Sequence, residues 1–150
     1  MNTRIDFSML FPAARNNYAG PNIAVWFLIF LNIIGTLRSL VHIFFRDSGA
    51  QSIATMNLNV SGSKNIVALL GQWGGGQLIV AFIIWIVLWR YREFVPLMIA
   101  EVAIEQFIRI AIGRMKPIIT ARTPPGGTGS MIVLPLATIM LIISLMHNGA

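Results

Sequence analysis

Four long apolar runs constrain the fold of this chain more than any other feature of its sequence. They lie at about residues 22–45, 66–89, 94–115 and 131–147. A helix of about 17–25 apolar residues crosses the hydrocarbon core of a bilayer. Of the 150 residues, 56% are hydrophobic and 11% are charged, which excludes an ordinary soluble domain. The length has room for one domain, residues 1–150, and we predict an all-α, integral membrane four-helix bundle with a short N-terminal arm.

The third apolar run is unusual because it carries charged residues in its interior. Glu101, Glu105 and Arg109 are spaced four residues apart, so on a helix they share one face. A charge near the centre of a bilayer costs about 2.5–3.5 kcal/mol on insertion scales. We therefore expect these side chains to face the interior of the bundle or a water-filled space, where other helices provide their partners.

Other polar residues lie at a similar depth in the first two runs. Arg38 and His42 lie one turn apart in the second half of the first run, and Gln72 and Gln77 lie in the first half of the second. A rise of about 1.5 Å per residue places all four in the half of an up-and-down bundle that also holds the charges of the third run. The predicted cluster consists of Arg38, His42, Gln72, Gln77, Glu101, Glu105 and Arg109.

This cluster has two interpretations. Two arginines and two glutamates make it formally neutral, as a buried network requires, so the charges could pair internally and hold the helices together. Alternatively, they line a polar cavity between the helices, where bundle proteins bind ligands. We favour the cavity, because four charges in a membrane cost more free energy than helix packing needs. We assign no metal site: Glu101, Glu105 and His42 could hold one ion, but their spacing is not specific to metal binding.

The segment between the last two runs, RMKPIITARTPPGGTGS at 114–130, is basic and rich in Pro and Gly. This composition predicts a loop without regular structure. Arg114, Lys116 and Arg122 could bind an anionic lipid headgroup or a ligand phosphate there, and solvated charges are the alternative. The formal net charge is +6, but no Lys or Arg residues are consecutive. We expect membrane lipids as partners, with other membrane subunits or a second copy of the chain as further candidates, and no nucleic acid.

The second run begins with the glycine-rich sequence GQWGGGQ. Gly71 and Gly75 form a small-xxx-small pair that lets a neighbouring helix approach closely. The successive glycines Gly74, Gly75 and Gly76 also weaken a helix, which favours a kink or local unwinding. We favour close helix packing here; exposure of backbone groups to a ligand is the alternative.

Four features together form a recognisable pattern: the long polar loop after the first run, the sequence GQWGGGQL, the Arg-x-Arg turn at 90–92, and the internal Glu and Arg of the third run. They extend over about residues 30–115. The pattern resembles the small four-helix bacterial membrane proteins called DoxX-like. This resemblance implies a four-helix fold and a location in the bacterial inner membrane, and it carries no catalytic residue over to this chain.

The sequence thus predicts a non-enzymatic integral membrane protein whose polar intramembrane pocket binds a small molecule or a lipid. Arg38 and Arg109 would hold an anionic or carbonyl group, while Glu101 and Glu105 would balance the charge or carry protons. One alternative is an accessory structural subunit of a larger membrane complex. Another is a quinone-linked redox subunit or a proton-coupled exporter. The chain has no cysteine, which excludes disulfides and thiol redox chemistry, and the sequence identifies no cofactor.

Overall fold

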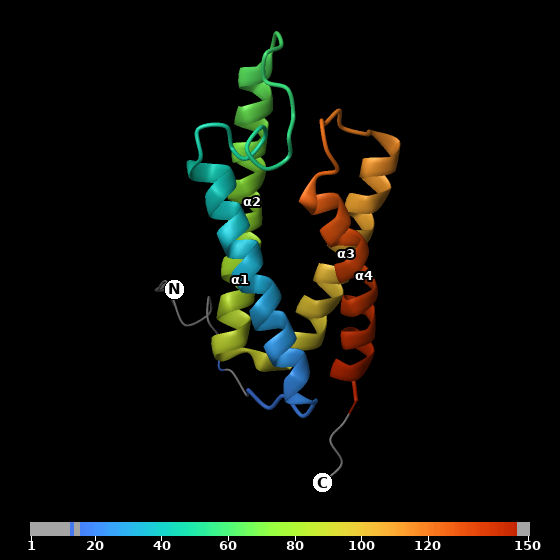
Figure 1. Ribbon diagram of the computed structural model, residues 1–150. Coiled ribbons are helices and arrows are strands. Elements are labelled where there is room, and N and C mark those ends of the chain that lie inside the picture. Colours follow the sequence, from blue (N-terminus) through green and yellow to red (C-terminus); the bar gives the residue numbers. More distant parts are fainter. Residues whose placement is uncertain (1–12, 14–15, 147–150) are drawn as a thin grey trace, which may run out of the picture.

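The computed structural model describes residue 13 and residues 16–146, and in this part of the chain all regular structure is helical. The helices are α1 (Asn22–Phe44), α2 (Ser63–Arg90), α3 (Val95–Met115) and α4 (Pro125–Ser144), with the short 3-10 turn η2 (Arg92–Phe94) between α2 and α3 (Figure 1). The predicted all-α, four-helix fold is confirmed. Most of the predicted N-terminal arm lies outside the described residues.

Three of the helices, α1, α2 and α4, are long and apolar enough to cross a membrane by length and composition. α3 has 21 residues, but any stretch of 18 residues within it contains Glu101, Glu105 and Arg109. Charges on a helix in a bilayer are stable only where they face protein or water. The charged face of α3 therefore has to lie against the other helices.

The helices form two antiparallel hairpins. α1 packs along α2 and α3 packs along α4, whereas the two pairs contact each other much less. Figure 1 shows the pairs side by side, joined at one end through η2. The pairs meet in an apolar core formed by Ala24, Val25, Leu28, Ile84, Leu88, Val95, Ile99, Val102, Ala103, Ala137 and Met140. These residues lie in the half of the molecule next to η2, so the other half of the contact between the hairpins is free to hold polar groups.

Glycine allows the close approach of α1 and α2. A Cβ atom at Gly74 would lie 2.5 Å from the Cβ of His42 and 3.2 Å from the carbonyl oxygen of Ser39. Gly71 also faces α1, but Gly75 has no neighbouring atom within 4 Å. Close packing, the favoured interpretation, therefore holds at Gly71 and Gly74. The prediction that Gly75 would face a neighbouring helix together with Gly71 was wrong. α2 runs as one helix through these residues, so local unwinding is not observed.

Buried hydrogen bonds add to this contact between α1 and α2. Asn32, which is buried, donates from Nδ2 to the carbonyl oxygen of Ala81 at 3.1 Å. The indole N–H of Trp85 donates to the hydroxyl of Thr36, also at 3.1 Å. Each bond satisfies a polar group that would otherwise be costly to bury. The polar side chains at this contact thus have partners inside the hairpin.

α4 begins earlier than the sequence suggested. Its first residue is Pro125, so the sequence PGGTGS at 125–130, expected to be part of an irregular loop, forms the first turns of the helix. Proline is favoured at the first helical position because its missing N–H would have no helical partner there. The correction has a structural consequence, since it places Gly126 and Ser130 on a helix that packs against α3.

The two loops at the end opposite η2 are joined through Thr55. Its carbonyl oxygen accepts a hydrogen bond from the N–H of Ala121 at 3.0 Å. Its hydroxyl accepts from the N–H of Arg122 at 3.0 Å and lies 3.2 Å from the Arg122 carbonyl oxygen, to which it donates. These bonds connect the α1–α2 loop to the α3–α4 loop, so the hairpins are tied at this end as well as through η2.

A carboxylate organises the loop that follows α1. Asp47 accepts hydrogen bonds from the backbone N–H groups of Gly49, Gln51 and Ser52 at 3.1, 3.0 and 2.6 Å. Burial alone would raise the pKa of Asp47, but these N–H groups and the Ser52 hydroxyl favour the charged form and lower the pKa to about 2. The loop is therefore built around an ionised aspartate.

Candidate ligand-binding site

A cavity of about 360 Å³ lies between the two hairpins. All four helices line it, and its volume falls in the range of about 300–1,000 Å³ that is usual for small-molecule sites. Its polar lining residues are Asn32, Arg38, Gln77, Glu101, Glu105, Gln106, Arg109 and Ser130. Its apolar lining residues include Leu28, Leu31, Val80, Ile84, Val102 and Val133, which belong to the apolar core or pack against it. The cavity is thus polar at one end and apolar at the other.

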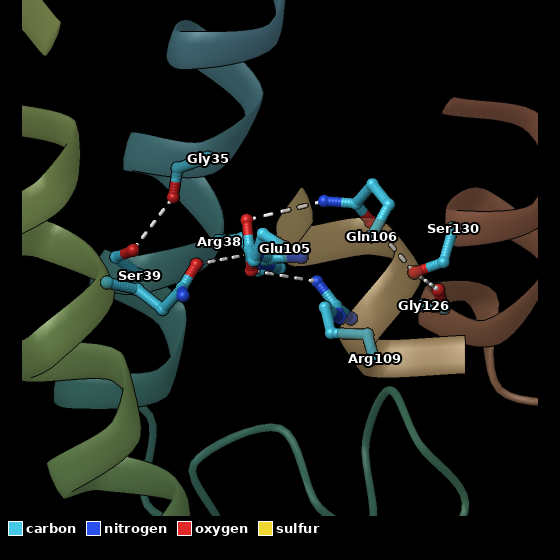
Figure 2. Close-up of polar contacts among 9 residues, drawn as sticks. Gly35, Arg38, Ser39, Glu105, Gln106, Arg109, Gly126 and Ser130 are labelled. Carbon is cyan, nitrogen blue, oxygen red and sulfur yellow. Dashed lines mark hydrogen bonds and ion pairs between the residues drawn. The ribbon is translucent and has the colours of Figure 1, made fainter. Parts of the chain in front are cut away.

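Glu105 lies between two arginines at the polar end. Its Oε1 atom is 3.8 Å from Nη2 of Arg38 and 3.7 Å from Nη1 of Arg109 (Figure 2). Arg109 is one turn further along α3, whereas Arg38 comes from α1, so the three charges connect the hairpins. Both distances are within the range of an ion pair but exceed the length of an N–H···O hydrogen bond, about 2.7–3.2 Å.

The long distances leave polar atoms without hydrogen bonds. Nε of Arg38, Oε1 of Glu105 and Nη1 of Arg109 are buried, and none of them has a hydrogen-bond partner among the described residues. An unsatisfied buried donor or acceptor costs about 1–3 kcal/mol, and more when it is charged. Such a group in a native structure calls for an explanation, and contact with a water, an ion or a ligand is one.

Amide and hydroxyl groups extend this cluster to the other helices. Nη2 of Arg38 donates to Oε1 of Gln77 on α2 at 2.7 Å. Nε2 of Gln106 donates to Oε2 of Glu105 at 3.3 Å, and the hydroxyl of Ser130 on α4 donates to Oε1 of Gln106 at 2.9 Å. The contacts between Glu105, Gln106 and Ser130 are drawn in Figure 2. One polar chain therefore reaches from α2 through α1 and α3 to α4.

Trp73 lies against both arginines. The guanidinium carbon of Arg38 is 5.3 Å from the centre of its ring, and that of Arg109 is 5.4 Å away. Both distances are within the roughly 6 Å range of a cation–π interaction. The ring therefore contacts both cations without neutralising their charge.

Glu101 differs from the other charged residues of the site. It lines the cavity one turn from Glu105, on the side of the apolar core. It forms no hydrogen bond or ion pair with any residue in the described part of the chain. The nearby arginines are engaged with Glu105 instead.

The structure brings five of the seven predicted cluster residues to the cavity. They are Arg38, Gln77, Glu101, Glu105 and Arg109.

The two others lie outside it. Gln72 is exposed and does not line the cavity. His42 packs on α2, with Nδ1 2.7 Å from the carbonyl oxygen of Ser48 and its ring 4.9 Å from that of Trp73. The possible metal set of His42, Glu101 and Glu105 is not assembled, because the described residues contain no group of three metal-ligating side chains.

The predicted anion-binding residues Arg114, Lys116 and Arg122 are all exposed. Arg122 contributes backbone hydrogen bonds to the junction with Thr55. Their exposure agrees with both lipid contact and solvation.

Sequence reasoning missed Trp73, Gln106 and Ser130. Trp73 carries no charge, although its position four residues before Gln77 places it on the same face of α2. Gln106 follows Glu105 directly and was overlooked beside it. Ser130 could not be placed while its segment was taken for a loop.

No family model matches the chain, and no curated protein or solved structure matches it. The chemistry of the site is therefore inferred from its own geometry. The resemblance to DoxX-like proteins stays a prediction.

Proposed function

We propose that this chain is a non-enzymatic integral membrane protein that binds a small molecule or a lipid in the cavity between its hairpins. The observation that carries the proposal is a set of buried charged atoms at the polar end of the cavity that have no hydrogen-bond partner in the described part of the chain: Arg38 Nε, Glu105 Oε1 and Arg109 Nη1. A ligand with an anionic or carbonyl group would satisfy the two donors.

The energetics favour a binding site over a purely structural ion-pair network. Ion pairs without hydrogen bonds and with partial solvent exposure contribute about 0–1 kcal/mol, and these side chains are between 22% and 30% exposed. Apolar residues of similar size at such a contact are often equally or more stabilising. Charges that add little to stability but line a cavity are better explained by a ligand.

The two arginines are arranged to share one acceptor group. Trp73 faces both guanidinium groups, and Gln77 orients Arg38 from α2. Arginine presents several N–H donors in a fixed plane, which suits carboxylate, phosphate and sulfonate oxygens. Held in this way, the arginines lose little conformational freedom when a ligand arrives.

We further propose in which membrane the protein resides and which lipids it contacts. Three helices can cross a membrane, and the resemblance in sequence pattern to DoxX-like proteins suggests the bacterial inner membrane. Lipids are then the most abundant molecules with access to the cavity. Arg114, Lys116 and Arg122 are proposed to contact lipid headgroups.

Native mass spectrometry of the protein, extracted in a mild non-ionic detergent, tests the proposal. We expect a bound species of defined mass on the wild-type chain and its loss from a variant with both Arg38→Gln and Arg109→Gln. Arg46→Gln, at an exposed position that does not line the cavity, is the control and should retain the species.

A bare wild-type chain would contradict the proposal. A wild-type chain that is recovered only with another membrane protein, and without a small ligand, would favour an accessory subunit instead.

A further inference from the structure

We infer that the ligand is a single-chain amphiphile with one negative charge, and that it binds together with one proton carried by Glu101. This inference rests on the proposed function and names the class of ligand and the ionic coupling of the same site. It follows from three features of the cavity: its polarity gradient, its charge count and the isolation of Glu101.

The lining changes from polar at one end of the cavity to apolar at the other, which fits an amphiphilic ligand. From Arg38 to Leu28 the cavity follows α1 for ten residues, about 15 Å of helix. Arg38 and Arg109 mark one end, whereas Leu28 and Ile84, both at most 5% exposed, mark the other. A headgroup at the arginines would thus leave an alkyl chain against apolar side chains.

The number of charges that line the cavity limits the charge of the ligand and indicates that a proton binds with it. The cavity lining has two positive residues, Arg38 and Arg109, and two negative ones, Glu101 and Glu105. With both carboxylates ionised the site is neutral, so a bound monoanion would leave an uncompensated charge in a medium of low polarity. Protonation of one carboxylate restores neutrality.

Glu101 is the carboxylate that takes the proton. Glu105 lies within ion-pair distance of two arginines, whereas Glu101 has no hydrogen bond or ion pair among the described residues. The charged lining groups around it are Arg38 from α1 and Glu105 and Arg109 from α3. α2 and α4 line the cavity with the neutral polar groups Gln77 and Ser130, and His42 lies outside it. No other titratable group of the lining is free to take up the proton.

Calorimetric titration with 1-octanesulfonate tests the inference, because a sulfonate stays ionised at any usable pH. The full chain in a maltoside detergent would be titrated between pH 5 and pH 8.5 in two buffers of different ionisation enthalpy. We expect about one proton taken up per sulfonate bound and, where Glu101 is ionised in the free protein, an affinity that falls about tenfold per pH unit. The variant with both Arg38→Gln and Arg109→Gln is titrated as the control, and its signal gives the partition of 1-octanesulfonate into the detergent micelle.

Two matched variants assign the proton. Glu101→Gln should bind 1-octanesulfonate with the same affinity at every pH and without proton uptake, whereas Glu101→Asp should keep the pH dependence. Neither change removes an ion pair or hydrogen bond of the described structure. If a variant does not fold, the proton count on the wild-type chain still decides the question.

Two shorter probes test the amphiphile. Methanesulfonate, which has the head alone, and 1-octanol, which has the tail alone, should each bind at least about tenfold more weakly than 1-octanesulfonate, since each lacks one set of contacts. If methanesulfonate binds as tightly as 1-octanesulfonate, the inference that the ligand is an amphiphile is overturned.

Binding of 1-octanesulfonate without proton uptake, or with the same pH dependence in Glu101→Gln, would overturn the coupled proton and leave the proposed function standing. No binding by the wild-type chain beyond that of the double arginine variant would reject the amphiphilic monoanion, and a bare wild-type chain in native mass spectrometry would reject the proposed function as well.

Discussion

The two contacts of α1 differ in how fully their polar groups are satisfied. Towards α2, its polar groups are satisfied: Asn32 bonds the backbone of α2, and the hydroxyl of Ser39 donates to the Gly35 carbonyl oxygen on its own helix at 2.8 Å. Towards the other hairpin, Arg38 keeps a buried Nε that has no hydrogen-bond partner among the described residues. The polar groups of the α1–α2 contact are therefore satisfied within the hairpin, whereas those between the hairpins are satisfied only in part.

The difference suggests a division of labour along the chain. Close packing within each hairpin, and the apolar core next to η2, provide the stability. On this division, the polar half of the contact between the hairpins can stay open and charged without a large loss of stability. Substitutions at the two contacts should accordingly affect different properties.

The largest effect on stability is expected at Gly74. A methyl group there would meet the Cβ of His42 and separate α1 from α2, so Gly74→Ala should lower the free energy of unfolding by about 2 kcal/mol. A Cβ atom at Gly76 would have no neighbouring atom within 4 Å, so Gly76→Ala should stabilise the helix by up to about 1 kcal/mol. Thermal unfolding in detergent measures both. Equal midpoints for the two variants would contradict the close packing.

A smaller effect is expected at Trp73. Trp73→Leu removes the aromatic face from Arg38 and Arg109 and should cost about 1 kcal/mol, together with a weaker affinity for 1-octanesulfonate. Trp89, which is 77% exposed, is the control, and Trp89→Leu should change stability by less than about 0.5 kcal/mol. The idea that Trp73 orients the arginines fails if Trp73→Leu binds the sulfonate as the wild type does.

The smallest effect is expected at Asp47, which lies away from both contacts. Asp47→Ala removes the acceptor of three backbone N–H groups and should cost about 1 kcal/mol, whereas Asp47→Asn keeps one acceptor oxygen and should cost less.

The pH dependence of this contribution has a definite sign. The pKa of Asp47 is about 2 in the folded chain, below its ordinary value of 3.8, so the stabilisation is complete above about pH 4 and is lost as the pH falls through 2. Unfolding of the wild type and Asp47→Ala between pH 2 and pH 6 should show the difference shrinking at the acid end. A constant difference would contradict the role of the ionised carboxylate.

Periodicity and depth were sufficient to predict part of the site. Arg38, Gln77 and the charges of α3 meet as expected, because the fixed rise of a helix converts sequence position into depth. Depth does not determine direction, however. Gln72 and Gln77 are five residues apart, which turns their side chains about 140° from each other on a helix, and only Gln77 faces the cavity.

Other features depended on contacts that the sequence does not display. Pairing of the helices into two hairpins requires knowledge of which faces pack, and it left Gly75 without the neighbour expected for it. The sequence did not indicate the start of α4, because proline and glycine occur both in loops and at helix starts. With that boundary misplaced, Ser130 could not be recognised as a partner of Gln106.

The central claim is that the charges between the hairpins serve binding and not stability, and a double-mutant cycle at Arg38 and Glu105 tests it most directly. Thermal unfolding of Arg38→Leu, Glu105→Leu and the double variant would be measured with and without 1-octanesulfonate at low pH. Glu105→Leu alone should destabilise by about 2 kcal/mol, because it leaves two arginines facing each other. The double variant should regain most of this loss, because the one positive charge left in the lining, on Arg109, is balanced by that of Glu101, and the sulfonate should stabilise it less than it stabilises the wild type. A double variant that stays destabilised, yet is stabilised by the sulfonate as much as the wild type, would contradict the account.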